Sequence, residues 1–97
     1  MGARTISNSA FISAASDVLV SEFGEELVIL NLRDGVYYGL EDVGSRIWSL
    51  LQEPVTISML RDALVEEFDV DPARSERDVR ALLEELAAHG LVEIQER

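Results

Sequence analysis

The stretch LVILNLRDGVYYGLEDVGSRIW, residues 27–48, decides the fold of this chain. It begins with aliphatic side chains over residues 27–32, interrupted by a single asparagine. Residues 33–35 (RDG) form a turn signal, because glycine accepts a positive φ and aspartate bonds its own backbone. Residues 36–40 are rich in strand-forming side chains, and the acids at 41–42 suit the positive end of a helix dipole. The stretch therefore predicts a strand, a tight turn, a second strand and a helix in immediate succession.

The neighbouring segments extend this pattern on both sides. Residues 17–23 (DVLVSEF) predict a first strand that turns at residues 24–26, so the simplest pairing of three consecutive strands is an antiparallel meander. A three-stranded sheet with one buried face needs a cover. Apolar side chains at helical spacing predict two helices that supply it, over residues 42–51 and, after a Thr56 N-cap, to residue 68.

A third helix and a short tail complete the chain. Asp71 with Pro72 at the first helical position predicts one start for this helix, and Ser75 offers a competing start. The helix continues to His89, and Gly90 marks its end. The alternation over residues 91–94 (LVEI) is compatible with a short terminal strand. The order predicts an α+β fold, in which a three-stranded antiparallel sheet is followed by a three-helix, winged-helix-like bundle and a short C-terminal strand.

Length and composition fit one folded domain. The chain has 97 residues, of which 47% are hydrophobic, so it can bury one modest core. We expect residues 17–97 to form a single domain and the Ser- and Ala-rich residues 1–16 to form a flexible or loosely docked arm.

Charge and residue usage exclude several classes of function. A formal charge of -11 argues against nucleic-acid and anionic-membrane partners, which need local positive charge. The absence of cysteine excludes disulfides, thiolate nucleophiles and Cys-ligated zinc. The sequence shows neither an apolar run long enough to span a bilayer nor a signal-peptide core, so a cytoplasmic location is expected.

No constellation of residues indicates catalysis, a metal or a cofactor. His89, the single histidine, stands at a helix end without an oriented nucleophile. Gly39 and Gly44 do not form a phosphate-binding loop, and most carboxylates fall on helix faces beside arginines, as in a solvated face. The helices leave open the alternative of a winged-helix DNA-binding regulator. However, the third helix carries four acids and three arginines, so the electrostatic attraction to phosphate is missing.

The strand over residues 36–40 is the main functional candidate. As the last strand of a meander it has a free edge unless the chain's own tail covers it, and a free edge is a template for an added peptide strand. The residues alone do not decide whether this edge is free or is covered by the chain's own tail. If the edge is free, the peptide-binding residues on the strand are Val36, Tyr37, Tyr38, Gly39 and Leu40.

The segment DGVYYGLEDVGSRIW at residues 34–48 resembles the signature of the PqqD-like family, with Glu41 where the family usually has asparagine. The resemblance continues through FDVD at residues 68–71 and LLEEL at residues 82–86 to GLV at residues 90–92. It implies a non-catalytic recognition element that binds the leader segment of a ribosomally made precursor peptide. In this family the leader adds as a strand to the third strand, beside the third helix, and is delivered to a maturation enzyme.

Transferred to this chain, the resemblance predicts a groove wall formed by Glu76, Arg80, Leu83 and Ala87 of the third helix. The opposite flank, with Ser75, Asp78 and Leu82, remains an alternative. The expected partners are a precursor leader peptide and either a lasso-type leader protease or a radical SAM enzyme of pyrroloquinoline quinone synthesis, with a slight preference for a lasso-type pathway. A monomer or a strand-exchanged dimer is compatible with an open edge.

Overall fold

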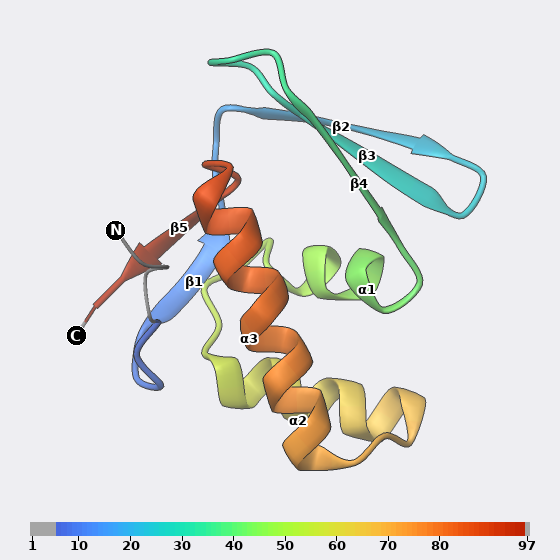
Figure 1. Cartoon of the computed structure of the whole chain (residues 1–97), viewed down its shortest axis with the longest axis vertical. Helices are drawn as coiled ribbons and strands as arrows, with labels where there is room; N and C mark the ends of the chain where they lie inside the picture. The colour runs from blue at the N-terminus through green and yellow to red at the C-terminus, as the bar shows by residue number, and fades with distance from the viewer. Residues whose placement is uncertain (1–5, 97) are drawn as a thin grey trace.

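The computed structural model describes residues 6–96 and has the α+β architecture predicted from the sequence (Figure 1). No helix within this part of the chain is long and apolar enough to cross a membrane. In chain order the elements are β1 (Phe11–Ala14), β2 (Val18–Phe23), β3 (Glu26–Asn31), β4 (Tyr37–Glu41), α1 (Val43–Leu50), α2 (Ile57–Phe68), α3 (Pro72–Ala88) and β5 (Val92–Gln95).

Three strands form the expected antiparallel meander in the order β2-β3-β4. The turn after β2 contains Gly24 with φ 65°, and the turn before β4 contains Gly35 with φ 74°, so both turns use the conformation that glycine accepts without strain. The central strand β3 places Leu27 opposite Leu40 and Ile29 opposite Tyr38. Strands β2 and β4 are therefore the two edges of this sheet.

The C-terminal strand does not cover the meander. β5 pairs with β1 in a separate two-stranded sheet, in which Ile12 lies opposite Ile94. Ile12 also exchanges backbone hydrogen bonds with Val55 in the connection between α1 and α2, at 2.7 and 3.0 Å. Figure 1 shows this pair of strands beside the upper end of α3, away from β4.

The expectation of a flexible or loosely docked N-terminal arm is wrong for residues 6–16. Ile6, Ala10 and Ile12 are buried in the core, and β1 is paired on its length with β5. The packed domain therefore begins before residue 17; residues 1–5 lie outside the described part. The error has a physical cause, because a four-residue strand with a partner about eighty positions away leaves little local pattern in the sequence.

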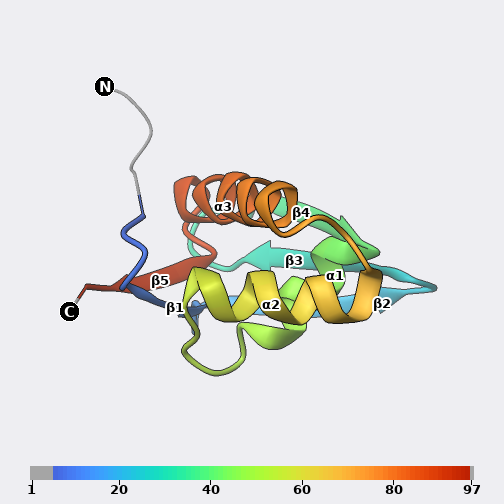
Figure 2. The ribbon, with the colours of Figure 1, turned by 90° about the horizontal axis from the view of Figure 1, so that it is seen from below.

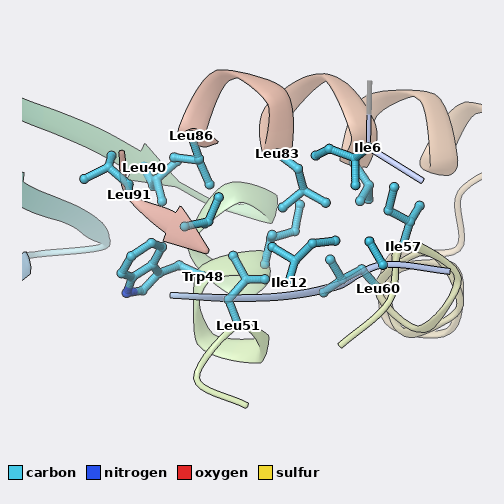
Figure 3. Packing of buried hydrophobic residues seen from close by; sticks show 14 of the residues in the cluster. Ile6, Ile12, Leu40, Trp48, Leu51, Ile57, Leu60, Leu83, Leu86 and Leu91 are labelled. Carbon is cyan, nitrogen blue, oxygen red and sulfur yellow. The ribbon is translucent and has the colours of Figure 1, made fainter. Parts of the chain in front are cut away.

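The core lies between α3, α1, α2 and β1 (Figure 3). Helix α3 buries Val79, Leu83 and Leu86 at helical spacing, which places all three on one face. Figure 3 shows Leu83 and Leu86 pointing from α3 toward Ile12 on β1 and Trp48 on α1. The β1 segment therefore completes the hydrophobic core.

Local capping explains where the last two helices begin. The Thr56 hydroxyl accepts from the Met59 N–H at 3.3 Å, as the N-cap prediction requires. The Asp71 carboxylate accepts from the Arg74 N–H at 3.0 Å, with Pro72 in the first turn. The Asp71 start is therefore used, and Ser75, the competing start, is buried inside α3.

Candidate functional site: the open edge of β4

The outer edge of β4 presents backbone groups that the sheet does not use. The Asn31 N–H donates to the Val36 carbonyl at 3.0 Å, which fixes the hydrogen-bonding phase between β3 and β4. In an antiparallel ladder this phase alternates along the strand, so Tyr38 and Leu40 bond β3. The N–H and C=O groups of Tyr37, Gly39 and Glu41 consequently point away from the sheet. The terminal strand β5 is paired elsewhere, so it does not occupy this edge.

The predicted strand residues divide into two groups. Gly39 and Tyr37 have outward backbone groups, as the edge hypothesis requires. Val36 lies just before β4, and its carbonyl is engaged by Asn31. Tyr38 and Leu40 direct their backbone groups toward β3, and the Leu40 side chain is buried in the core.

Glu41 is an edge residue that the sequence prediction omitted. It ends β4, lies opposite Glu26 and shares the phase of Gly39. The alternation of outward- and inward-facing backbone groups along a strand could have identified Glu41. To use it, the position of the Gly35 turn had to be known to within one residue.

Helix α3 borders the inner side of this edge. The Tyr38 hydroxyl donates to the Glu85 carboxylate, and the Tyr38 and His89 rings lie with centroids 5.3 Å apart. Burial raises the pKa of Tyr38 to about 12, and the hydrogen bond to Glu85 and its negative charge act in the same direction. In Figure 2, α3 and β4 run along the same side of the molecule. The flank of α3 with Glu85 and His89 thus faces β4.

A cleft of about 630 Å³ opens where β4 runs into α1, and it continues along the same flank of α3. Arg74 and Asp78 form an exposed ion pair at 3.9 Å on its α3 side. A cleft with mainly apolar walls and few polar groups suits the side chains of an extended peptide. Its apolar lining comes from α1, α2, the α2–α3 connection and α3, through Val43, Leu64, Phe68, Val70 and Leu82.

A bidentate ion pair joins α1 and α2, the two shorter helices that line this cleft. Arg46 of α1 donates to both carboxylate oxygens of Glu67 on α2, each at 2.8 Å. This hydrogen bonding and the positive charge of Arg46 lower the pKa of Glu67. Because the planar guanidinium matches a carboxylate in two bonds, the pair fixes the orientation of α1 relative to the end of α2.

The α3 flank chosen from the resemblance does not face the cleft. Leu83 is fully buried, and Ala87 is packed against the core. Arg80 donates to the Ile6 carbonyl and to Asn8, so the N-terminal segment covers it. Glu76 bonds Arg61 of α2 at 2.9 Å and with Arg80 borders a separate shallow hollow of about 340 Å³.

The alternative flank is the one beside the cleft. Ser75, Asp78 and Leu82 all line it. On a helical wheel of α3, the two candidate flanks lie on either side of the apolar stripe. The wheel therefore does not choose between them, because the choice depends on where β4 lies. The chosen flank is turned toward β1 and the N-terminal segment, whose packing the sequence did not indicate.

Asn31 is a further residue whose role the sequence did not indicate. Its side chain is buried, donates to the His89 carbonyl at 2.8 Å and accepts from the Arg33 N–H at 2.9 Å. It joins the end of β3 to the end of α3. Since β4 is bonded to β3, this tether fixes the distance between the β4 edge and α3. A single polar residue in an aliphatic strand was the available signal.

A strand edge that residues 6–96 leave unpaired, beside an apolar cleft, is the arrangement of domains that bind an extended peptide by strand addition. The family comparison agrees with this class. The family model described as "Coenzyme PQQ synthesis protein D (PqqD)" matches residues 26–92, from the start of β3 to the start of β5. The chain belongs to the PqqD family. A comparison with curated proteins gave no match.

Solved structures share the fold. The chain is similar to TbiB1 in complex with the TbiA(beta) leader peptide, with 41% identity, a TM-score of 0.77, and 84% of this chain and 94% of that chain covered. Lasso peptide synthetase B1 complexed with the leader peptide has 24% identity and a TM-score of 0.75 over 84% and 96% of the two chains.

A third similar structure is the PqqD truncation of Methylobacterium extorquens PqqCD, described as a functional and stand-alone recognition element for ribosomally synthesized and post-translationally modified peptides. It has 23% identity and a TM-score of 0.77 over 92% and 95% of the two chains. At this identity, as with the lasso synthetase, the similarity shows the fold.

Proposed function

We propose that this protein is a non-catalytic adaptor that binds the leader segment of a ribosomally made precursor peptide and delivers it to a maturation enzyme. The observation that carries the proposal is the free edge of β4 beside the apolar cleft. The leader would add as a fourth strand, bonded to Tyr37, Gly39 and Glu41. The leader side chains on the side of the sheet that faces the helices would enter the cleft beside Leu82.

The energetics of such an edge fit a reversible adaptor. Three residues each offer one N–H and one C=O, and a backbone hydrogen bond contributes about 0.5–1.5 kcal/mol net. Apolar side chains buried in the cleft add about 25 cal/mol per Å². After the cost of ordering the peptide, the sum is compatible with micromolar or tighter binding, which corresponds to about -8 kcal/mol.

The expected effect on maturation is one of effective concentration. Holding the leader keeps the core peptide near the enzyme without any chemistry by the adaptor. TbiB1, which is 41% identical, is a leader-peptide complex, and lasso peptide synthetase B1 shares the fold. Our first assignment is therefore a lasso-type pathway with a leader protease as partner. A pyrroloquinoline quinone pathway with a radical SAM enzyme is the second assignment, supported by the description of the matching family model as a coenzyme PQQ synthesis protein.

A DNA-binding role has no support from the site. The flank of α3 that is free of the N-terminal segment carries Asp78 and Glu85, and Glu84 is near them on the same helix. These acids would meet phosphate oxygens, and repulsion would offset the contacts of Arg74.

The test is a titration of the protein against fluorescent leader peptides encoded beside its gene, read by anisotropy. Saturable binding at micromolar concentration or tighter, with no binding of a scrambled leader of the same composition, supports the adaptor role. A folded protein that binds none of these leaders, or that instead shifts duplex DNA at physiological salt, would contradict it.

A further inference from the structure

The face of the meander that points away from the helices is largely apolar, and the described part of the chain does not cover it. The register puts Leu19, Leu30 and Tyr37 in one row across the three strands. Leu19 and Tyr37 are 55% and 68% exposed, and Phe23 on the same face of β2 is 63% exposed. On the other face, by contrast, Ile29 is fully buried. Figures 1 and 2 place all three helices on that other side.

The same outer face carries an unfavourable pair of charges at the opposite end of the strands. Glu26 of β3 lies directly opposite Glu41 of β4. The Glu26 carboxylate leans over Gly39, since its Oε2 lies 2.9 Å from where a Cβ would stand. Neither glutamate forms an ion pair with a cation among residues 6–96. Like charges directly opposite each other destabilise a strand pair, so a cation placed between them would be favourable.

We propose that this outer sheet face, comprising Leu19, Phe23, Glu26, Val28, Leu30, Tyr37 and Glu41, docks the maturation enzyme. The inference rests on the proposed function. The occupant is a protein surface with an apolar centre, which covers the Leu19 row, and a lysine or arginine that reaches the two glutamates. Exposed apolar patches of this kind mark interaction surfaces, and a basic group opposite paired carboxylates supplies specificity.

The position of the face supports an enzyme as the occupant. β4 belongs to both surfaces, because its backbone edge is open to the leader while Tyr37 and Glu41 belong to the outer face. An enzyme seated there would lie one strand away from the bound leader. The core peptide that follows the leader would therefore emerge beside the enzyme.

A second copy of this chain fits the face poorly. If two outer faces stack in parallel, four carboxylates meet without a cation. If they stack antiparallel, each Glu26–Glu41 pair is buried against the apolar row of the other copy. The chain as a whole carries a net charge of -11, which adds repulsion in either arrangement.

The experiment compares Leu19→Glu and Glu26→Lys with Met59→Glu. Met59 on α2 is 51% exposed, so Met59→Glu puts the same new charge on an equally accessible apolar site away from the sheet. The probe is the purified maturation enzyme encoded beside the gene, and its affinity is measured by biolayer interferometry with and without leader. Leader affinity is measured in parallel by anisotropy.

We expect Leu19→Glu and Glu26→Lys to weaken enzyme binding by about tenfold or more, with leader affinity within about twofold of the wild type. Met59→Glu should change neither. Glu26→Lys also removes the repulsion with Glu41, so its melting temperature should stay or rise while enzyme affinity falls. Damage to the fold would lower both.

Two results would overturn the docking surface and leave the adaptor role intact. One is unchanged enzyme affinity in both face variants while leader binding is retained. The other is a concentration-dependent dimer in sedimentation that Leu19→Glu abolishes, which would assign the face to a second copy. If the wild-type protein binds no leader, the proposed function is rejected, and this inference with it.

Discussion

Replacing Gly39 by proline tests the β4 edge at its centre. The Gly39 N–H points away from β3, so the substitution removes a donor that the folded protein itself does not use. The proline ring would also occupy the space through which an added strand approaches. Within the sheet the change costs no ladder bond, only the strain of fixing φ near -65° in an extended strand, on the order of 1 kcal/mol.

The loss of affinity can be worked from this geometry. One backbone hydrogen bond contributes about 0.5–1.5 kcal/mol net, which is roughly two- to thirteenfold in Kd. The ring also displaces the facing peptide segment, which weakens the bonds at Tyr37 and Glu41. We therefore expect leader binding to weaken by about 10- to 100-fold.

Two controls isolate the donor. Gly39→Ala keeps the N–H, and its new Cβ meets only the movable end of the Glu26 side chain, so we expect leader affinity within about twofold of wild type. Glu22→Pro makes the same change on the opposite edge. The Leu32 N–H donates to the Asp17 carbonyl at 3.0 Å, and by alternation the Glu22 N–H also faces away from the sheet.

The assay is anisotropy of labelled leader with each variant, after circular dichroism has shown that it is folded. Wild-type affinity in a folded Gly39→Pro protein would refute strand addition at β4. Equal losses for Gly39→Pro and Glu22→Pro would assign the effect to the sheet as a whole.

Four further predictions follow from the same contacts. Leu82→Asp should weaken leader binding by about tenfold, whereas Arg80→Ala should leave it within about twofold; the reverse order by anisotropy would favour the other flank of α3. Asn31→Leu leaves the His89 carbonyl without its donor and should lower the free energy of unfolding by about 2–3 kcal/mol, seen as a melting temperature lower by roughly 8–20 °C. A change under about 3 °C would reject the tether. Ile12→Ala should cost about 2–5 kcal/mol in urea unfolding, against nearly none for a loose arm. Because the pKa of Tyr38 is raised to about 12, the folded state holds this proton more tightly than the unfolded chain, whose tyrosine pKa is about 10. Stability from this group is complete below pH 10 and falls as pH rises to about 12; Tyr38→Phe should remove that part of the decline in urea midpoints, and an unchanged pH profile would contradict it.

The sequence predicted the elements whose signals are local. The Gly35 turn, the Thr56 cap and the Asp71-Pro72 helix start each depend on residues within a few positions of one another. Each element formed as expected, with strand ends shifted by about one residue. The meander order followed as well, because short connections leave few alternative pairings.

The features that were missed depend on contacts between distant segments. β1 is a strand only because β5 and Val55 supply its hydrogen bonds, and neither partner is near it in the chain. The flank of α3 that lines the cleft is set in the same way. Arg80 is occupied by residues 6–8, and Asp78 is left beside the cleft. A helical wheel gives the faces of a helix but does not say which neighbour covers each one.

The structure also explains why this edge is suited to reversible recognition. β4 is already paired with β3, and the Asn31 tether and the Tyr38–Glu85 hydrogen bond hold it at a fixed distance from α3. The edge is therefore preorganised, and most of the ordering entropy on binding belongs to the peptide. A flexible β4 would share that cost and lose affinity for the same set of bonds. Loosening the tether, as in Asn31→Leu, should therefore weaken leader binding as well as stability, although Asn31 contributes no group to the outer edge of β4.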